Sequence, residues 1–159
     1  MRRIISNPFL ELVGYNCFGC APHNRHGLGM VFFEDGDLVG AEWDPEGHFQ
    51  GYGDVLHGGI AATLMDEVAG WAVFVKLATA GLTMEMLVKY LQPAYVNRGI
   101  LTITARVEER SAKAARIETR LCDNDGQVCS EGSFLYRIYP ESVARKKLNY
   151  PGIDAFFPE

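Results

Sequence analysis

An apolar segment at residues 60–77 constrains the fold of this chain more than any other feature. Its apolar side chains recur at helical spacing, at Ile60, Leu64, Val68, Trp71 and Val75. Further small or apolar residues widen this stripe, namely Ala61, Met65, Ala69 and Ala72. A helix that is apolar around most of its circumference must be enclosed by other structure. The rest of the chain must therefore supply a surface that wraps around it.

The segments after this helix have the two-residue period of antiparallel strands. Apolar and polar side chains alternate through 101–108 and again through 115–121. A turn at Asp123–Gly126 leads into a strand at 128–139, and a strand at 83–91 precedes them all. Such strands bury one face and leave the other in water. The predicted class is α+β, with an antiparallel β-sheet wrapped around one long central helix.

The chain divides into three parts. Residues 1–28 are predicted to be an irregular segment with a cysteine loop and a short helical turn at 9–13. Residues 29–140 form the main domain, which opens with a hairpin whose strands, 30–34 and 38–43, flank Asp35-Gly36-Asp37. Residues 141–159 are predicted to be a tail that packs locally.

The composition argues against several classes of protein. The net charge is −5 and the one short basic run, Arg145-Lys146-Lys147, is expected to be a solvated turn, so we expect no nucleic-acid partner. We also expect no membrane partner, because no segment reaches the apolar length of a membrane span and the first residues lack a signal-peptide pattern. The expected location is cytoplasmic, where the four cysteines remain thiols.

An acid within the apolar helix is the first candidate for chemistry. The neighbours of Asp66 on its face of the helix are all small or apolar, namely Ala62, Ala69, Gly70 and Val73. Burial raises the pKa of a carboxyl group unless a distant group pairs with it, and a raised pKa suits a general base. A structural hydrogen-bonding role is the alternative. Glu67 lies on another stripe, where a surface or interface pair would explain it.

Two glycines precede the helix and form the second candidate. The first turn of a helix has backbone N–H groups without internal partners, and glycine lets a substrate carbonyl come close to them. Gly58 and Gly59 can therefore build an oxyanion hole, and His57 can orient this turn or touch the substrate. The alternative is a simple turn with a helix cap.

The combined spacing resembles a known family. His57-Gly58-Gly59, followed by Asp66 nine positions after the histidine, resembles the hotdog-fold acyl-CoA thioesterases of the phenylacetate-pathway type. Other segments between about residues 15 and 140 are similar to the same family, namely Gly81-Leu82-Thr83, Val88–Ala94, Cys17–Asn24 and Gly27-Leu28.

The resemblance implies a mechanism. Asp66 matches the catalytic acid, which acts as general base or nucleophile, and the Gly59 N–H matches the oxyanion donor. Thr83 matches the residue that holds the attacking water, and His57 matches the histidine that positions the thioester. The family's sites lie at a dimer interface, so Thr83 would serve Asp66 of the other subunit. The resemblance also implies a homodimer, often doubled to a homotetramer (a dimer of dimers), and no cofactor.

One position departs from this pattern. Many relatives carry an Asn six residues before the histidine, where this chain has Gly51. Gln50 can replace that Asn if the loop shifts by one residue. The expected substrate-binding residues are Gly58, Gln50 and Glu67.

The cysteine loop has the pattern C-x2-C-x2-H-x2-H. Cys17, Cys20, His23 and His26 are residue types that suit zinc, but the set is packed into ten residues and the family resemblance explains the cysteines without a metal. We expect reduced thiols and no metal.

The expected activity is hydrolysis of an acyl-CoA thioester to a free acid and CoA. A non-catalytic acyl-CoA-binding hotdog protein is the alternative, and a hotdog dehydratase fits the order of His and Asp less well. Candidates for the CoA phosphates are Arg98, Lys113 and Arg116.

Overall fold

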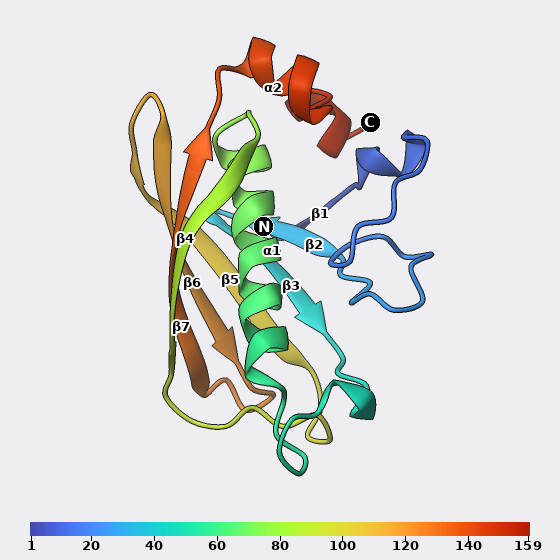
Figure 1. The fold of residues 1–159 in the computed structure, drawn as a ribbon, viewed down its shortest axis with the longest axis vertical. Helices are drawn as coiled ribbons and strands as arrows, with labels where there is room; N and C mark the ends of the chain where they lie inside the picture. Colours follow the sequence, from blue (N-terminus) through green and yellow to red (C-terminus); the bar gives the residue numbers. More distant parts are fainter.

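A single antiparallel sheet curves around one long helix in the computed structural model, which describes residues 1–159 (Figure 1). The seven strands have the order β1-β2-β3-β5-β6-β7-β4, and the helix is α1 (Gly58–Lys76). The strands are β1 (Arg3–Ile5), β2 (Phe32–Asp35), β3 (Leu38–Trp43), β4 (Gly81–Tyr90), β5 (Leu101–Arg110), β6 (Ala114–Cys122) and β7 (Val128–Ile138). The predicted α+β class and the sheet wrapped around a central helix are confirmed.

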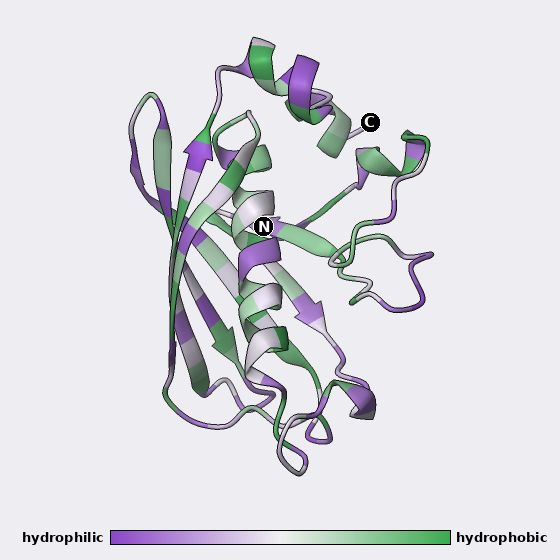
Figure 2. Cartoon of the chain, in the orientation of Figure 1, coloured by the Kyte–Doolittle hydropathy of each residue, from purple (hydrophilic) through white to green (hydrophobic).

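Helix α1 forms the centre of the core because its apolar stripe meets the inner face of the sheet. Leu64, Met65 and Val68 are fully buried there. A hydrophilic band crosses the middle of α1, where the sequence has Asp66 and Glu67 (Figure 2). By length and mean hydropathy, 1.3 over 18 residues, α1 could cross a membrane. The expectation that no segment reaches that length was therefore wrong, but half of this window is buried within the fold, as a core helix requires.

The hairpin before the helix is confirmed. β2 and β3 pair antiparallel, and Gly36 turns the chain with a φ of 57°. The segment before it, predicted to be irregular, contains β1, which adds to the outer side of β2. It also contains a 3₁₀ turn, η1 (Pro8–Glu11), close to the predicted helical turn.

The C-terminal residues do more than pack locally. They form α2 (Glu141–Leu148) and a 3₁₀ turn, η3 (Ile153–Phe156). Tyr150 and Phe156 are buried against α1, and the Tyr150 hydroxyl donates to the Phe74 carbonyl at 3.1 Å. The prediction of a locally packed tail was therefore wrong, because its aromatic side chains complete the core.

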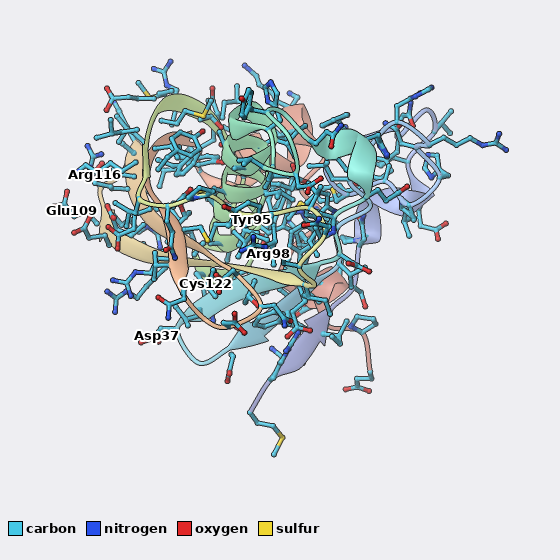
Figure 3. The ribbon with its side chains drawn as sticks, turned by 90° about the horizontal axis from the view of Figure 1, so that it is seen from below. Asp37, Tyr95, Arg98, Glu109, Arg116 and Cys122 are labelled. Carbon is cyan, nitrogen blue, oxygen red and sulfur yellow. The ribbon has the colours of Figure 1, made fainter.

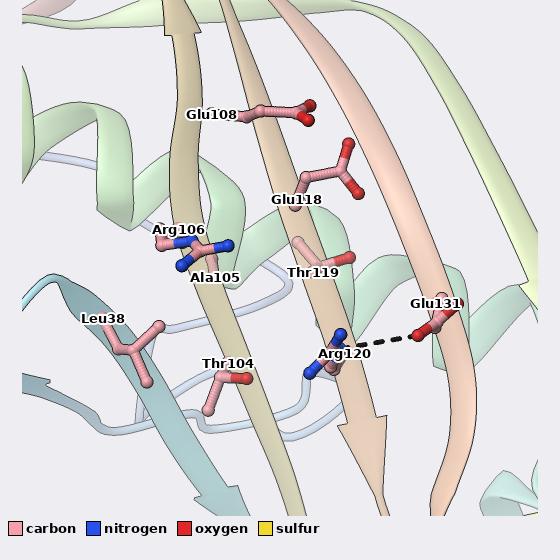
Figure 4. Close-up of a pocket in the computed structure, with 9 residues that line it drawn as sticks. All are labelled: Leu38, Thr104, Ala105, Arg106, Glu108, Glu118, Thr119, Arg120 and Glu131. Carbon is pink, nitrogen blue, oxygen red and sulfur yellow. Dashed lines mark ion pairs between the residues drawn. The ribbon is translucent and has the colours of Figure 1, made fainter.

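The outer face of the sheet is polar. A hollow of about 490 Å³ on β3, β5, β6 and β7 is lined mainly by charged and hydroxyl side chains (Figure 4). Arg120 and Glu131 pair across its strands at 3.5 Å, and both side chains are well exposed. Exposed pairs of this kind contribute little to stability. This face behaves as a solvated surface and leaves the functional site to the helix side.

Candidate active site

Two hydroxyl groups hold the Asp66 carboxylate in place. Thr83, on β4, donates to Asp66 Oδ1 at 2.8 Å, and Tyr136, on β7, donates to the same oxygen at 2.7 Å. The Tyr136 hydroxyl also lies 2.8 Å from the Asp66 backbone carbonyl. Oδ2 of Asp66 has no hydrogen bond, so it can accept a proton from a water or meet a substrate. These hydroxyls are the distant partners that the apolar helix itself does not supply.

Tyr136 is a site residue that the sequence analysis missed. Burial and the nearby Asp66 charge raise the pKa of Tyr136 well above its usual range, so the hydroxyl remains a donor. It reaches Asp66 past Gly70, where a Cβ atom would lie 3.4 Å from the Tyr136 oxygen. The small residue at position 70 therefore admits a tyrosine.

A bulge in β4 turns two of its side chains toward α1. Thr83 contacts Asp66, and Tyr90 donates to the Gly58 carbonyl at 2.5 Å. These two β4 residues are seven positions apart and would face opposite sides of a regular strand. The register shifts between Thr83 and Glu85, which restores a common face.

The turn before α1 forms a second polar cluster. The His57 side chain caps the helix, because its Nδ1 accepts the Gly59 N–H at 3.0 Å. In this state the predicted oxyanion donor is therefore bonded to the predicted positioning histidine. The Gly58 N–H has no partner, and the Tyr90 hydroxyl beside it completes the cluster. Rotation of the His57 ring would free the Gly59 N–H for a substrate carbonyl.

The two clusters lie on the same side of α1 but are well separated. Gly59 and Asp66 are seven residues apart, which places them about 10 Å apart along the helix. Oxyanion donors must lie within about 3 Å of the reacting oxygen. The Asp66 carboxylate therefore cannot attack a carbonyl bound at Gly59 of the same chain directly.

Each cluster borders a cavity. The cavity at Asp66 has a volume of about 370 Å³ and includes Thr83, Tyr136 and Glu67, with a mainly apolar wall of Phe9, Leu12, Trp71, Phe74 and Leu148. The cavity at Gly58 has a volume of about 410 Å³ and includes Tyr90. Apolar pockets with few polar groups are typical of small-molecule sites.

Position 51, and not position 50, faces the histidine. A Cβ atom on Gly51 would lie 3.3 Å from the His57 Cα. Gln50 is exposed, forms a β-bridge with Leu56 and makes no side-chain hydrogen bond. The structure therefore does not bring Gln50 into the role of the missing Asn.

Glu67 lies beside the cysteine loop, and not on the surface. The Cys17 thiol donates to Glu67 Oε1 at 3.6 Å, and Trp71 Nε1 donates to the same oxygen at 3.3 Å. Burial, and then the charge of Cys17, raises the pKa of Glu67 to about 7. A hydrogen bond from Cys20 lowers the pKa of Cys17 to about 5, and the same contact raises that of Cys20. We expected a surface or interface pair for Glu67, and the surface position was wrong because the N-terminal loop covers this residue.

The basic candidates for CoA phosphates do not gather at either cluster. Arg98 stacks on the Tyr95 ring at 3.6 Å, and Arg116 lies on β6, where it donates to Ser133 at 3.0 Å (Figure 3). Lys113 lies in the turn before β6 and is exposed. These residues do not form one anion-binding patch within a single chain.

The family model described as the thioesterase superfamily matches residues 53–130 of this chain, a range that includes His57, Asp66 and Thr83. A comparison with curated proteins finds no significant match.

Solved structures share the fold. The thioesterase superfamily protein RHA08564 is 26% identical with a TM-score of 0.68, and the match covers 73% of this chain and 57% of that protein. The chain thus spans little more than half the length of that protein. AziG from S. sahachiroi is 25% identical with a TM-score of 0.64, covering 71% of this chain and 94% of AziG.

A hypothetical thioesterase from Streptococcus pneumoniae TIGR4, crystallised with coenzyme A, has a TM-score of 0.62. It is 19% identical, and the match covers 66% of this chain and 83% of that one. The sheet wrapped around α1 is thus a hotdog fold. The sequence match and the shared fold make this chain similar to the thioesterase superfamily.

Proposed function

We propose that this protein hydrolyses acyl-CoA thioesters, with Asp66 as general base or nucleophile. The observation that carries the proposal is the Asp66 carboxylate, held through Oδ1 by Thr83 and Tyr136 at an apolar cavity, with Oδ2 free. The coenzyme A in the Streptococcus pneumoniae structure makes CoA esters the first substrate class to test.

In this mechanism a water molecule attacks the thioester carbonyl while Asp66 Oδ2 takes its proton. The carbonyl oxygen becomes an oxyanion, which backbone N–H groups at the start of α1 stabilise. The intermediate collapses, the C–S bond breaks, and the CoA thiolate leaves with a proton returned from Asp66. The products are a free acid and CoA, and no cofactor takes part. In direct attack, an Asp66 oxygen would bond to the carbonyl carbon, the C–S bond would break and CoA would leave, and water would then hydrolyse the resulting anhydride to the free acid and the Asp66 carboxylate.

The two clusters come together when a second copy pairs along β4. This strand is a long edge, and its residues Leu82, Met84, Met86, Leu87 and Tyr90 are all more than half exposed. Such edges are templates for pairing with another strand. In antiparallel two-fold pairing, the Thr83 end of one β4 lies opposite the Tyr90 end of the other.

This pairing places Asp66 of one chain near the start of α1 in its partner. It therefore overcomes the separation of about 10 Å within one chain. Because Thr83 bonds to Asp66 of its own chain, the element shared between subunits in our proposal is the glycine turn at 57–59, and not Thr83 as the resemblance implied. The proposed assembly is a homodimer, and a dimer of dimers remains compatible with it. Each chain has four free cysteines, which fit a reducing compartment, so we propose a cytoplasmic location.

The test is a panel of acyl-CoA esters with detection of the released thiol. We expect the wild-type chain to hydrolyse at least one ester, and Asp66→Asn to lower kcat by about 100-fold or more with the fold retained. Asp37→Asn, which changes an exposed acid in the β2–β3 turn, is the matched control and should leave kcat unchanged. An unchanged kcat in Asp66→Asn would refute the assignment.

The non-catalytic alternative has two observations in its favour. The Gly59 N–H is already bonded to His57, and position 51 lacks the Asn of many relatives. This alternative predicts that acyl-CoA raises Tm while no ester of the panel releases thiol.

A further inference from the structure

The N-terminal segment meets the core helix at a cluster of potential ligand atoms. Cys17, Cys20 and Glu67 each contribute one such atom, and these atoms lie within 4.8 Å of one another. Cys17 Sγ is 3.6 Å from Glu67 Oε1. In a tetrahedral zinc site, with Zn–S about 2.3 Å and Zn–O about 2.0 Å, sulfur and oxygen ligands lie about 3.5 Å apart. The observed spacing matches two ligands of one ion.

The backbone between the cysteines is shaped for this approach. A Cβ atom on Gly19 would overlap the Glu67 carboxyl group, so glycine at this position lets that side chain lie directly against the loop. The Ala21 N–H closes the turn on the Cys17 carbonyl at 3.2 Å, which keeps both cysteines in one tight loop.

The cluster lacks a positive charge. Glu67 forms no ion pair, and its hydrogen bonds come from Trp71 and Cys17. The Tyr15 hydroxyl, 2.9 Å from Cys20 Sγ, is a further neutral partner. Two thiols and a carboxyl group packed together without a basic residue must be neutralised, either by their own protons or by a bound cation. A divalent cation would balance two of the three negative charges.

The histidines of the loop do not belong to this cluster. His23 Nε2 lies 2.7 Å from the Tyr15 carbonyl, and the exposed His26 is not among the grouped donors. The sequence pattern C-x2-C-x2-H-x2-H therefore does not describe the site, and its third protein ligand comes from α1.

We propose that Cys17, Cys20 and Glu67 bind one thiophilic divalent cation of the zinc class. Because all three residues line the cavity that contains Asp66, water from that cavity would fill the fourth position. The ion would fasten the N-terminal segment to α1 as a fixed wall of the cavity. This assignment replaces our sequence expectation of reduced thiols without metal.

The test uses the full-length chain, reduced and stripped of metal, and titrates it with Co²⁺ in place of Zn²⁺. We expect one Co²⁺ per chain, a near-ultraviolet charge-transfer band from cobalt–thiolate bonds, and displacement by Zn²⁺. Zn²⁺ should also raise Tm. Absence of the band in the folded wild-type chain overturns the proposal, and this readout needs no substrate and no hydrolysis.

Variants identify the ligands. Cys17→Ser should abolish the thiolate band or weaken Co²⁺ binding by about 100-fold or more, and Glu67→Gln should weaken binding by at least about 10-fold. Cys122→Ser, which removes a thiol outside the cluster, and His23→Ala should bind Co²⁺ as the wild type does. Equal binding by wild type and Glu67→Gln, or loss of binding in His23→Ala, overturns the ligand set. The wild-type titration decides the proposal by itself. A variant that fails to fold therefore does not change the conclusion.

Discussion

The exposed strand β4 gives the sharpest prediction about assembly. Met86 lies at the middle of β4, shares the helix-facing side with Tyr90, and is 53% exposed in the single chain. Complete burial of a Met side chain stabilises by about 1.5–3 kcal/mol, so burial of the exposed half contributes about 1 kcal/mol. In a two-fold dimer the substitution acts in both copies. Met86→Asp should therefore cost about 2 kcal/mol from lost apolar burial alone, which is about 30-fold in Kd.

The introduced carboxylates add a desolvation cost, so we expect a larger total effect. The assay is sedimentation over a range of chain concentrations, together with thioesterase activity at the same concentrations. Met86→Asp should shift the chain to a monomer and lower its activity per chain. Val31→Asp changes an apolar residue of similar exposure outside β4 and should do neither. A Met86→Asp chain that dimerises and hydrolyses like the wild type would refute pairing through β4.

Three further substitutions test the site and the fold. Thr83→Val removes one of the two hydroxyls that donate to Asp66, and it should lower kcat by about 10-fold or more with little change in KM. An unchanged kcat would contradict a positioning role for Thr83. Gly51→Asn should raise kcat, by up to about 100-fold, if its amide reaches the oxyanion; an unchanged kcat in a folded variant would place position 51 away from the carbonyl. Glu34 has a pKa held below its usual value: burial opposes this shift, but hydrogen bonds from Lys76 and Arg3 outweigh it. Its stabilisation is present above the unfolded pKa and is lost as pH falls. Glu34→Gln should therefore lower the free energy of unfolding by about 1–2 kcal/mol at neutral pH, and this difference from wild type should shrink in denaturation curves as acid protonates Glu34; a constant difference would contradict this sign.

Local patterns in the sequence predicted the main elements of the fold. The apolar stripe of α1 and the alternation in β5, β6 and β7 depend on residues a few positions apart, so they are visible without the structure. β1 was missed because three residues carry too little pattern and its pairing with β2 is remote in sequence. The buried role of Phe156 was missed for a similar reason, since its aromatic partners Phe9 and Trp71 lie far away along the chain.

The candidate site was predictable only in part. Asp66 and the glycine turn stand out because polar or flexible residues interrupt an apolar run. Tyr136 is 70 positions from Asp66, and only closure of the sheet around α1 brings it there. The side of β4 that Thr83 faces depends on a bulge with no signal that we could recognise in the sequence. The adjacency of Glu67 to the cysteine loop depends on how the N-terminal segment docks.

The central claim is that Asp66 of one chain works with the glycine turn of its partner. Mixing two inactive chains tests it directly. Asp66→Asn removes one half of the site, and Gly59→Pro removes the proposed oxyanion donor in the first helical turn, where proline is tolerated better than in a helix interior. Both variants must first be shown to fold and to dimerise.

Equal amounts of the two chains are unfolded together, refolded and assayed for thioester hydrolysis. Half of the dimers should be mixed, and each mixed dimer should contain one site with both intact halves. A shared site therefore predicts recovery of about one quarter of the wild-type activity. A site contained within one chain predicts no recovery, and mixtures as inactive as either variant alone would contradict the account.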